Sequence, residues 1–559
     1  MTRQLSNLFT LLIINSLFIS LPAQELARFE ISGNKVFENQ FYIDFINQNP
    51  NLTREEFTFR LSKELSSQGY FNSKIIQFSL DTVSNSNSPK YNLEIREGSP
   101  TYVSEIIIDS LTSDDSVEVI DFFSFFMDKV FIQSELENRI QETLVYLENK
   151  GFPFAKFTIN SLEFFEDDDL NYVNIYLSLD KYKLRKIDKV EIIGNDKTND
   201  DVIINAARLN KGEIYSHQRI LAIPETLNKL RFFSDIKEPR YYINSNEEGI
   251  LQITLTEKNT NTFDGIIGYV PSTTSNESGY FTGFVNISLR NLFGTGRGAA
   301  FKWQQENSST QELEIDYLEP WIFNQPLNLN FQFFQRKQDS SYVKRIIGGS
   351  VEYLATENIA ASVLVESESI IASINKSNQL ARNSSSINSG IRLKVDYRDN
   401  IIAPRSGSYF ISTYKYRNKK IGKEEELPSS IKSRDVEYHN YELDFGIFYS
   451  LFGNQVLAFG IHAKEIIGDY FDISDYFQFG GTNTLRGYRE KQFLGNRIIW
   501  SNLEYRFLLS QTSYVFTFFD TGYYLISKNE DINIEGQSDY KSGYGVGISL
   551  ETALGVMKV

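Results

Sequence analysis

The stretch "FTGFVNISLR" (Phe281–Arg290) has the alternation that decides the fold of the C-terminal half of this chain. Side chains that follow one another along a β-strand point to opposite faces of the sheet. One face of this strand therefore carries apolar residues and a glycine, namely Phe281, Gly283, Val285, Ile287 and Leu289. The other face is mostly polar, with Thr282, Phe284, Asn286, Ser288 and Arg290. An apolar outer face and a polar inner face are typical of a membrane barrel with a wet lumen.

The same alternation recurs along residues 259–559. The stretch "IWSNLEYRF" (Ile499–Phe507) repeats it, with polar and apolar residues in strict alternation from Asn502 to Phe507. We count about fourteen such strands and the start of another. A soluble β-sandwich is the alternative, but strands of about ten residues repeated over about 300 residues favour a transmembrane β-barrel.

The composition of the 559 residues agrees with a barrel and excludes several kinds of chemistry. Aromatic residues make up 14%, as many outward-facing strands require. The net charge of −16 argues against nucleic acid as a partner. Cysteine is absent, so disulfides and thiolate catalysis are excluded, and the three histidines His217, His439 and His462 have no neighbour at metal-ligand spacing. We therefore expect no catalytic residue, no metal and no cofactor.

The first residues, "MTRQLSNLFTLLIINSLFISLPAQ", have the pattern of a secretory signal peptide, predicted to span residues 1–23. Arg3 supplies the positive charge, Leu8 to Leu21 the apolar core and Ala23 the small residue at the cleavage site. A membrane anchor is the alternative, but about 14 apolar-biased residues are too few for a helix that spans a bilayer. The sequence thus predicts an exported protein.

Between the signal and the barrel the chain repeats itself with a period of about 80 residues. Each repeat opens with a strand, at Ala27–Asn34, Thr101–Ser110 and Leu184–Asn195, and the first and third strands both end in Gly-Asn, a turn signal. Each then has an amphipathic helix, followed by an aromatic corner and a strand pair. The order strand–helix–strand–strand predicts three small α+β modules.

The helix starts can be predicted from their capping residues. Thr53 and Glu56 are spaced as a capping box in the first module, and Ser134 and Glu137 in the second. Ser216 is the expected cap in the third module, where Pro224 should kink the helix or end it early. A sheet edge in such modules could accept an extended peptide as an added strand, and a rigid spacer is the alternative.

One segment of the barrel region, "QFGGTNTLRGYREKQFLGN" (Gln478–Asn496), is unusual for a hairpin tip. It sets a bulky apolar residue, a cation, a glycine and an aromatic in a row, Leu485, Arg486, Gly487 and Tyr488. Polar tips exposed to solvent rarely need such a combination. With the motifs that follow, an ordinary exposed hairpin with a surface arginine becomes the less favoured interpretation.

Five motifs in order resemble the BamA/TamA superfamily of outer-membrane assembly factors, and the modules resemble its polypeptide-transport-associated (POTRA) domains. The motifs are "LRNLFGTGRG" (Leu289–Gly298), "YLEPWIFNQPLNL" (Tyr317–Leu329), "DYRDNIIAPRSGSYF" (Asp396–Phe410), "GGTNTLRGYRE" (Gly480–Glu490) and "FFDTG" (Phe518–Gly522). The resemblance covers nearly all of the chain after the signal.

The resemblance implies a role for the unusual loop. In this family the loop folds back into the barrel, and its arginine pairs with acids on the lumen wall. Carried over to this chain, Arg486 should meet Glu504 and Asp520, since a guanidinium in a confined lumen requires carboxylates. Glu504 lies on the polar face of its strand. Asp520, in contrast, falls on the same strand face as the aromatic residues Tyr514, Phe516 and Phe518.

The resemblance also implies the domain organisation. We expect POTRA modules at residues 24–98, 99–182 and 183–258, and an outer-membrane barrel of the sixteen-stranded type at 259–559. A barrel of that type needs a further strand after "GYGVGISLETALGVMKV" (Gly543–Val559), so we expect a truncated C-terminal end, with an incomplete barrel as the alternative. The modules should lie in the periplasm.

The function implied is the assembly of other outer-membrane proteins. The modules would capture unfolded clients, and the barrel would insert them into the lipid bilayer at the seam between its first and last strands. Three modules resemble the TamA branch, which works with a large periplasm-spanning partner that would dock on the first module. A two-partner-type polypeptide secretion pore is the alternative, although such exporters usually have two modules and a plug helix. The chain has no Gly-x-Ser-x-Gly or His-Glu-x-x-His motif, so we expect no enzyme.

Overall fold

The structure is a computed structural model that describes residues 28–49, 52–81, 90–111, 113–271, 279–339, 341–372, 381–427, 431–528, 530, 534–552 and 555–558. The predicted signal peptide at 1–23 lies outside the described residues. Within them, none of the helices combines the length and the apolar character needed to cross a bilayer. The chain divides into two compact units, one of Met1–Lys186 with Ile214–His217 and the other of Ile187–Glu213 with Gln218–Val559.

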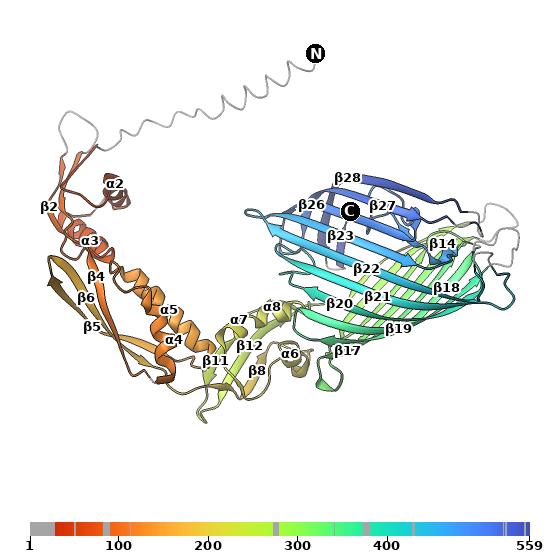
Figure 1. Ribbon diagram of the computed structural model, residues 1–559, viewed down its shortest axis with the longest axis horizontal. Helices are drawn as coiled ribbons and strands as arrows, with labels where there is room; N and C mark the ends of the chain where they lie inside the picture. The colour runs from red at the N-terminus through yellow and green to blue at the C-terminus, as the bar shows by residue number, and fades with distance from the viewer. Residues whose placement is uncertain are drawn as a thin grey trace, which may run out of the picture. The chain divides into compact units, whose positions relative to one another are not determined.

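The first module is an α+β domain with two helices on a three-stranded sheet of order β1-β3-β2 (Figure 1). Its elements are β1 (Arg28–Ser32), α2 (Asn39–Gln48), α3 (Arg54–Ser67), β2 (Lys74–Asp81) and β3 (Lys90–Arg96). The capping box of Thr53 and Glu56 at the start of α3 is confirmed. Helix α2 was not expected, because its preceding residue Glu38 makes no capping bond with its side chain. Its buried residues Tyr42 and Ile46 complete the core.

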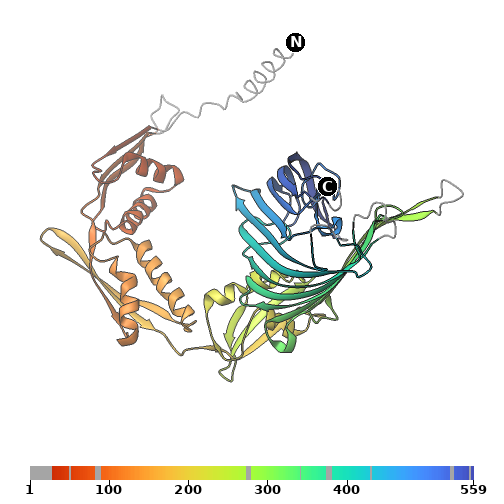
Figure 2. The ribbon, with the colours of Figure 1, turned by 45° about the vertical axis from the view of Figure 1, so that its right-hand side comes forward.

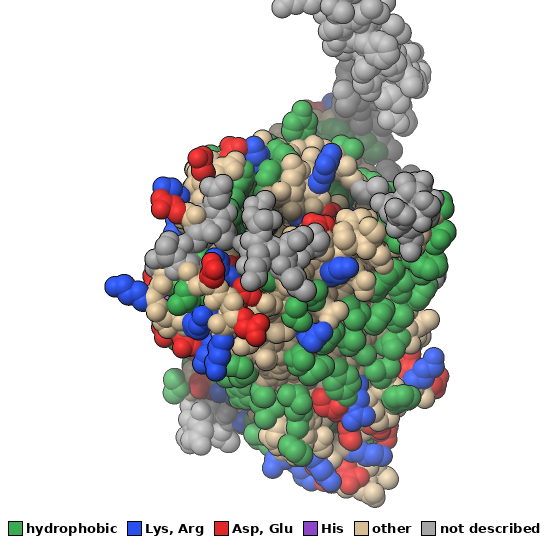
Figure 3. Space-filling view, turned by 90° about the vertical axis from the view of Figure 1, so that its right-hand side faces the viewer, with side chains coloured by type: hydrophobic (Ala, Val, Ile, Leu, Met, Phe, Trp, Pro, Cys, Tyr) green, Lys and Arg blue, Asp and Glu red, His purple; other side chains and the backbone are tan. Residues whose placement is uncertain are grey.

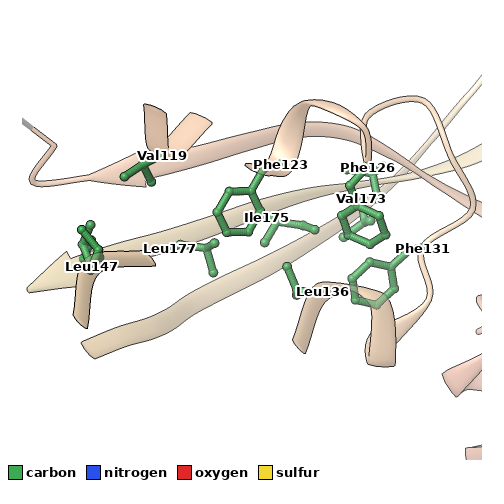
Figure 4. Packing of buried hydrophobic residues seen from close by; sticks show 11 residues of the cluster. Val119, Phe123, Phe126, Phe131, Leu136, Leu147, Val173, Ile175 and Leu177 are labelled. Carbon is green, nitrogen blue, oxygen red and sulfur yellow. The ribbon is translucent and has the colours of Figure 1, made fainter. Parts of the chain in front are cut away.

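The second module repeats this plan with a longer strand pair. Its elements are β4 (Thr101–Asp109), α4 (Ser113–Ser124), α5 (Gln133–Asn149), β5 (Lys156–Asp167) and β6 (Leu170–Asp180), with sheet order β4-β6-β5. Figure 4 shows Phe123 and Leu136 from the helices packed on Val173, Ile175 and Leu177 of the central strand. The predicted capping box of Ser134 and Glu137 is wrong, because α5 begins at Gln133 after Ile132 and so includes Ser134.

The third module begins with the short strands β7 (Lys186–Ile187) and β8 (Lys189–Ile193). Strand β8 pairs with β12 in a sheet that also contains β10 and β11. The remaining elements are α6 (Asp200–Ala206), β9 (Glu213–Ile214), α7 (His217–Leu221), α8 (Ile223–Asn228), β10 (Phe233–Ile236), β11 (Arg240–Ile243) and β12 (Gly249–Glu257). The predicted break at Pro224 is confirmed, since this residue stands in the first turn of a separate helix, α8. Proline fits there because the first turn has no intrahelical partner for its nitrogen.

A glutamate near the end of the last strand fixes the Gly-Asn turn in the first and third modules. In the first module, Glu97 is 2% exposed and accepts hydrogen bonds from the backbone N–H of Lys35 (2.5 Å), Val36 (2.7 Å) and Phe37 (2.9 Å). The Tyr42 hydroxyl donates a fourth bond of 2.6 Å to it. In the third module, Glu257 accepts bonds from the backbone of residues 197 and 198 in the same way. The turn signal in the sequence thus has a carboxylate partner about 60 residues away.

We expect Glu97→Gln to destabilise the first module by about 1–3 kcal/mol, since charge-assisted bonds weaken and one acceptor oxygen becomes a donor. Burial opposes ionisation of Glu97, but the bonds from Tyr42 and from the backbone prevail and lower its pKa below 4.5. The stability that this carboxylate contributes is therefore present above about pH 4.5 and is lost as the pH falls through the lowered pKa. Hydrogen exchange of residues 28–49 between pH 3 and 7 would measure the loss. Glu94→Gln on the exposed face of β3 is the matched control, and an equal effect of both changes would contradict the prediction.

The C-terminal region forms a single antiparallel sheet of fifteen strands among the described residues, each paired with its neighbours in chain order (Figure 1). The strands are β13 (Thr262–Val270), β14 (Tyr280–Leu292), β15 (Arg297–Gln305), β16 (Gln311–Glu319), β17 (Leu327–Gln338), β18 (Tyr342–Leu354), β19 (Ile359–Ala372), β20 (Ser384–Asp396), β21 (Gly407–Ile421), β22 (Asp435–Ser450), β23 (Gln455–Ile467), β26 (Arg497–Leu508), β27 (Tyr514–Ile526), β28 (Gln537–Thr552) and β29 (Gly555–Lys558). The sheet curls strongly (Figure 2), and Cα atoms of β13 and β29 approach within 8 Å. The predicted membrane barrel is confirmed.

The two faces of the sheet differ as the alternation predicts. On β26, the side chains of Leu503, Tyr505 and Phe507 are 41–45% exposed on the outside, whereas Glu504 and Arg506 are buried on the inside. Hydrophobic side chains gather over a broad area of the wall in Figure 3. Lipid-facing residues of a barrel appear exposed in the isolated protein because no polypeptide covers them. The charged side chains on the inner face can therefore form ion pairs with one another and with loops that enter the lumen.

Candidate functional site

A long loop between β23 and β26 folds against the inner face of the barrel. It contains a short helical turn, η3 (Ile473–Asp475), and a small strand pair of β24 (Phe477–Phe479) and β25 (Phe493–Gly495). Between those two strands lies the Leu-Arg-Gly-Tyr tip. The strand pair stiffens the loop, so the tip is carried on an ordered stem.

The structure brings Arg486 to both of the carboxylates that the resemblance implies. Its Nε and Nη2 atoms lie 2.7 Å from the two oxygens of Asp520, and its Nη1 lies 2.5 Å from Glu504 Oε1. The backbone N–H of Arg486 also donates to Asp520, at 3.1 Å. The three side chains are only 11%, 0% and 6% exposed. A bidentate pair at such burial binds strongly and holds its geometry, because the planar fork matches the carboxylate.

Glu504, the second acid of this site, also contacts two further cations. Arg506 lies 2.7 Å from Glu504 Oε2, and Lys558 of β29 lies 3.5 Å from Glu504 Oε1. Glu504 on β26 therefore connects Arg486 of the loop with Arg506 of the same strand and with Lys558 of β29. By contrast, Asp520 has Arg486 as its only cation among the described residues.

Tyr514, Phe516 and Phe518 lie on the same face of β27 as Asp520, and this face points into the lumen. An aromatic face of a barrel strand would be expected to point outward to lipid. Tyr514 and Phe516 are 4–5% exposed, and the Arg486 guanidinium lies 3.9 Å above the centre of the Phe518 ring. A guanidinium can stack on an aromatic face while its edges bind carboxylates. The inward aromatics thus form a platform for the arginine, which alternation alone could not show.

The neighbours of Arg486 fix the tip on strand β28. Leu485 is completely buried, and the Tyr488 hydroxyl donates to the Ser542 carbonyl at 3.0 Å. Gly487 has φ +92°, a conformation that side chains disfavour. Gly543 of β28 lies under the tip, and a Cβ atom there would be 2.0 Å from the Arg486 carbonyl oxygen. Sequence reasoning missed Gly543, although alternating glycines in "GYGVG" (Gly543–Gly547) were a signal for close approach of another chain segment.

A second buried ion cluster, also missed from the sequence, holds the other end of the loop. The Lys419 ammonium of β21 lies 2.8 Å from Asp472 and 2.7 Å from Asp475 of the loop, and all three side chains are at most 2% exposed. Arg417 of the same strand lies 3.0 Å from Asp475, and Arg382 lies 3.2 Å from Asp472. The two aspartates at i and i+3 resemble a helix-capping pair in sequence, which hides their long-range partners.

A third contact reaches the opposite part of the sheet. Lys491, five residues after Arg486, pairs with Glu312 of β16 at 2.5 Å, and Glu312 also binds Arg336 of β17 at 2.7 Å. The loop is thus tied to β16, to β21 and to the adjacent pair β26 and β27, three parts of the sheet that are widely separated in its strand order. Ion pairs at these positions brace the barrel from within.

The described residues contain no cluster of histidine or acidic side chains suited to a metal ion. His462 is held by Asp444 at 2.8 Å and stacks on Trp500, and His439 contacts the Tyr414 hydroxyl at 2.8 Å. Each has a protein partner, so neither is assigned a separate chemical role. The arrangement as a whole can position a loop and bind charged groups.

A lipid-facing barrel with an ion-paired loop in its lumen, joined to small α+β modules, defines an outer-membrane protein with periplasmic modules. The family model described as the Omp85 superfamily domain matches residues 291–559, and that for POTRA, described as the surface antigen variable number repeat, matches residues 185–258. The resemblance to the BamA/TamA superfamily is thus confirmed over these two regions, an Omp85 superfamily domain preceded by a POTRA module. The barrel lies in the bacterial outer membrane and the modules lie in the periplasm.

Relatives of the chain include two proteins named outer membrane protein assembly factor BamA. The one from Nitratidesulfovibrio vulgaris is 23% identical over 64% of this chain and 46% of its own length. The one from Neisseria meningitidis is 19% identical over 48% of this chain and 33% of its own length. The chain therefore spans less than half the length of these relatives. A solved structure of BamA from Haemophilus ducreyi lacking POTRA domains 1–3 matches with a TM-score of 0.48 and 15% identity, over 82% of this chain and 95% of that one.

Proposed function

We propose that this protein assembles other outer-membrane proteins: its modules capture unfolded clients, and its barrel inserts them into the bilayer at the seam between its first and last strands. The curated relatives named as assembly factors support this proposal. Neither step needs an energy source, because a barrel satisfies all its backbone hydrogen bonds once it has closed in lipid.

The observation that carries the proposal is the loop in the lumen. Its ties to β16, β21 and β26 run across the interior through buried ion pairs. A client chain that crossed the barrel lengthwise would have to compete with these pairs. Insertion at the seam leaves them intact, so assembly is favoured over a secretion pore.

The capture step is supported by the edge strand β5 of the second module. It is twelve residues long and pairs only with β6 in its described sheet. Ile159, Phe164 and Phe165 on it are 40–49% exposed. A long edge strand with exposed apolar side chains is the kind of surface to which an extended peptide adds as a further strand.

We expect Ile159→Lys to reduce capture of an unfolded client about tenfold, because a lysine on an edge strand disfavours pairing with another strand. Photo-crosslinking of a urea-unfolded barrel client to the full chain would measure the change. Val117→Lys on α4 of the same module is the matched control, since Val117 is 77% exposed and lies away from the edge. If both variants capture the client as well as the wild type does, β5 is not the capture edge.

Quantitative proteomics of the outer membrane after depletion of this protein would test the function as a whole. We expect many unrelated barrel proteins to decrease together. An unchanged outer membrane, with one large exoprotein retained in the periplasm, would instead identify a two-partner-type secretion pore.

We further propose the three-module organisation of the TamA branch, with module boundaries at 98/99, 182/183 and 258/259. A periplasm-spanning partner would then dock on the first module. Purification of the full chain from cross-linked cells would test this: a partner bound to the wild type but not to a chain lacking residues 24–98 is expected.

A further inference from the structure

A cavity of about 950 Å³ opens inside the barrel, next to the third module. Its wall combines Lys229–Phe232, at the corner between α8 and β10, with the inner faces of strands β14 to β22. These residues all lie in the second compact unit.

Four of the five carboxylates on the cavity wall have a neighbour that pairs with them or donates a hydrogen bond to them. Glu366 lies 2.8 Å from Lys415, Glu442 lies 3.0 Å from Lys464, and Asp444 lies 2.8 Å from His462. Glu352 accepts a bond from Asn328. Asp316 is the one wall carboxylate without a hydrogen bond or ion pair among the described residues, and the other four are occupied.

Two arginines on the same wall have no such partner. Arg231 of the third module and Arg290 of β14 both line the cavity, and neither has a side-chain hydrogen bond or ion pair within the described part of the chain. Arg297 close by, in contrast, is paired with Glu319 at 2.8 Å. The difference sets Arg231 and Arg290 apart as free guanidinium groups in a semi-enclosed space.

The environment of these two groups is electrostatically unfavourable. Burial, together with the nearby charge of Arg290, lowers the pKa of Arg231 to about 10, and the attraction of Glu551 on β28 offsets only part of this. The backbone of Arg231 is left-handed, with φ +64°, which is uncommon outside glycine. Like charges held near one another in a confined space without an ion-pair partner are typical of a site that receives an anion.

We propose that Arg231 and Arg290 form a binding site for carboxylates of an extended client polypeptide at the periplasmic mouth of the barrel. This inference rests on the proposed function and specifies the acidic side chains of the client as the ligand. A guanidinium pair suits carboxylates by charge and by fork geometry. A polypeptide is favoured over a lipid phosphate because the cavity is lined by lumen-facing residues, and a headgroup would have to leave the bilayer to reach it.

The test compares two labelled peptides on the full chain in phosphatidylcholine nanodiscs. One peptide alternates Glu with Ser, and its counterpart alternates Gln with Ser. Fluorescence anisotropy at constant salt should show the wild type binding the Glu peptide about tenfold more tightly than the Gln peptide, the size of one charge-assisted contact. The double variant Arg231→Gln/Arg290→Gln should bind both peptides equally. Lys420→Gln, at an ammonium that is 64% exposed outside the cavity, should keep the preference.

Each other outcome overturns the inference. A wild type without preference for the Glu peptide shows that no carboxylate site exists, and this comparison needs no variant to fold. A double variant that keeps the preference places the site elsewhere. If phosphatidylglycerol in the nanodisc abolishes the wild-type preference, the arginines bind lipid. Client insertion into vesicles, measured in parallel, separates the two proposals: insertion without peptide preference removes only this site, and peptide preference without insertion removes only the assembly function.

Discussion

Arg486→Ala is expected to destabilise the barrel by about 3–5 kcal/mol, the cost of leaving a buried charge without its partner. Asp520 would be the orphan, because it is completely buried and Arg486 is its only cation among the described residues. Glu504 would keep Arg506 and Lys558. Urea unfolding in detergent micelles, followed by tryptophan fluorescence, measures the loss, and Trp500 packs against Phe479 of the loop stem as a local reporter.

The pairing argument also predicts a partial rescue. Asp520→Asn in the Arg486→Ala background should recover part of the lost stability, since it removes the unpaired charge. Arg486→Lys should fall between wild type and alanine, because an ammonium cannot bind both acids with the planar fork. The control is Arg345→Ala on β18, an exposed arginine whose side chain donates to Gln335 at 3.1 Å. Arg486→Ala with wild-type stability would falsify the pairing role.

Lys419→Met is expected to have a comparable effect, about 3–5 kcal/mol, with a different local signature. The ammonium of Lys419 binds both Asp472 and Asp475, so its removal leaves two carboxylates facing each other at full burial. Arg417 and Arg382 neutralise them only in part. Hydrogen exchange should therefore accelerate strongly at residues 470–476, while the tip around Arg486 changes less.

Lys420→Met is the matched control for this second prediction. It is the neighbouring residue on the same strand, but its side chain points to the other face and is 64% exposed, with Asp435 at 3.9 Å. Exposed pairs of that kind contribute at most about 1 kcal/mol. Equal exchange at residues 470–476 in both variants would show that the buried cluster does not hold the loop.

The local elements of the fold could largely be predicted from the sequence. The period of two in residues 262–552 predicted the strands and their lipid-facing side, since this pattern depends only on the alternation of neighbouring side chains. The start of α3 followed from Thr53 and Glu56, three residues apart. Helix α2 has no capping bond and was missed, and α5 was predicted but begins slightly earlier than its expected cap, because helix ends without a capping bond are set by packing.

In the candidate site, too, local sequence patterns could not predict the contacts between residues that are distant in the chain. Arg486, Glu504 and Asp520 could be paired in advance only through the resemblance to a family, whereas alternation placed Asp520 among aromatic residues expected to face lipid. Lys419 and Asp475 are 56 residues apart, and Arg231 and Arg290 lie in different domains, so no local pattern relates them. Gly543 acquires its role only when the tip of a distant loop lies on it.

By itself, the sequence determined an exported chain of repeated α+β modules followed by a two-faced sheet, because backbone alternation and helix capping act over a few residues. Only the tertiary structure decided which buried charges neutralise one another and which remain free. Ion pairs of this kind depend on the curling of the sheet, which brings strands far apart in the chain to one lumen, where low solvent access makes every unpaired charge costly.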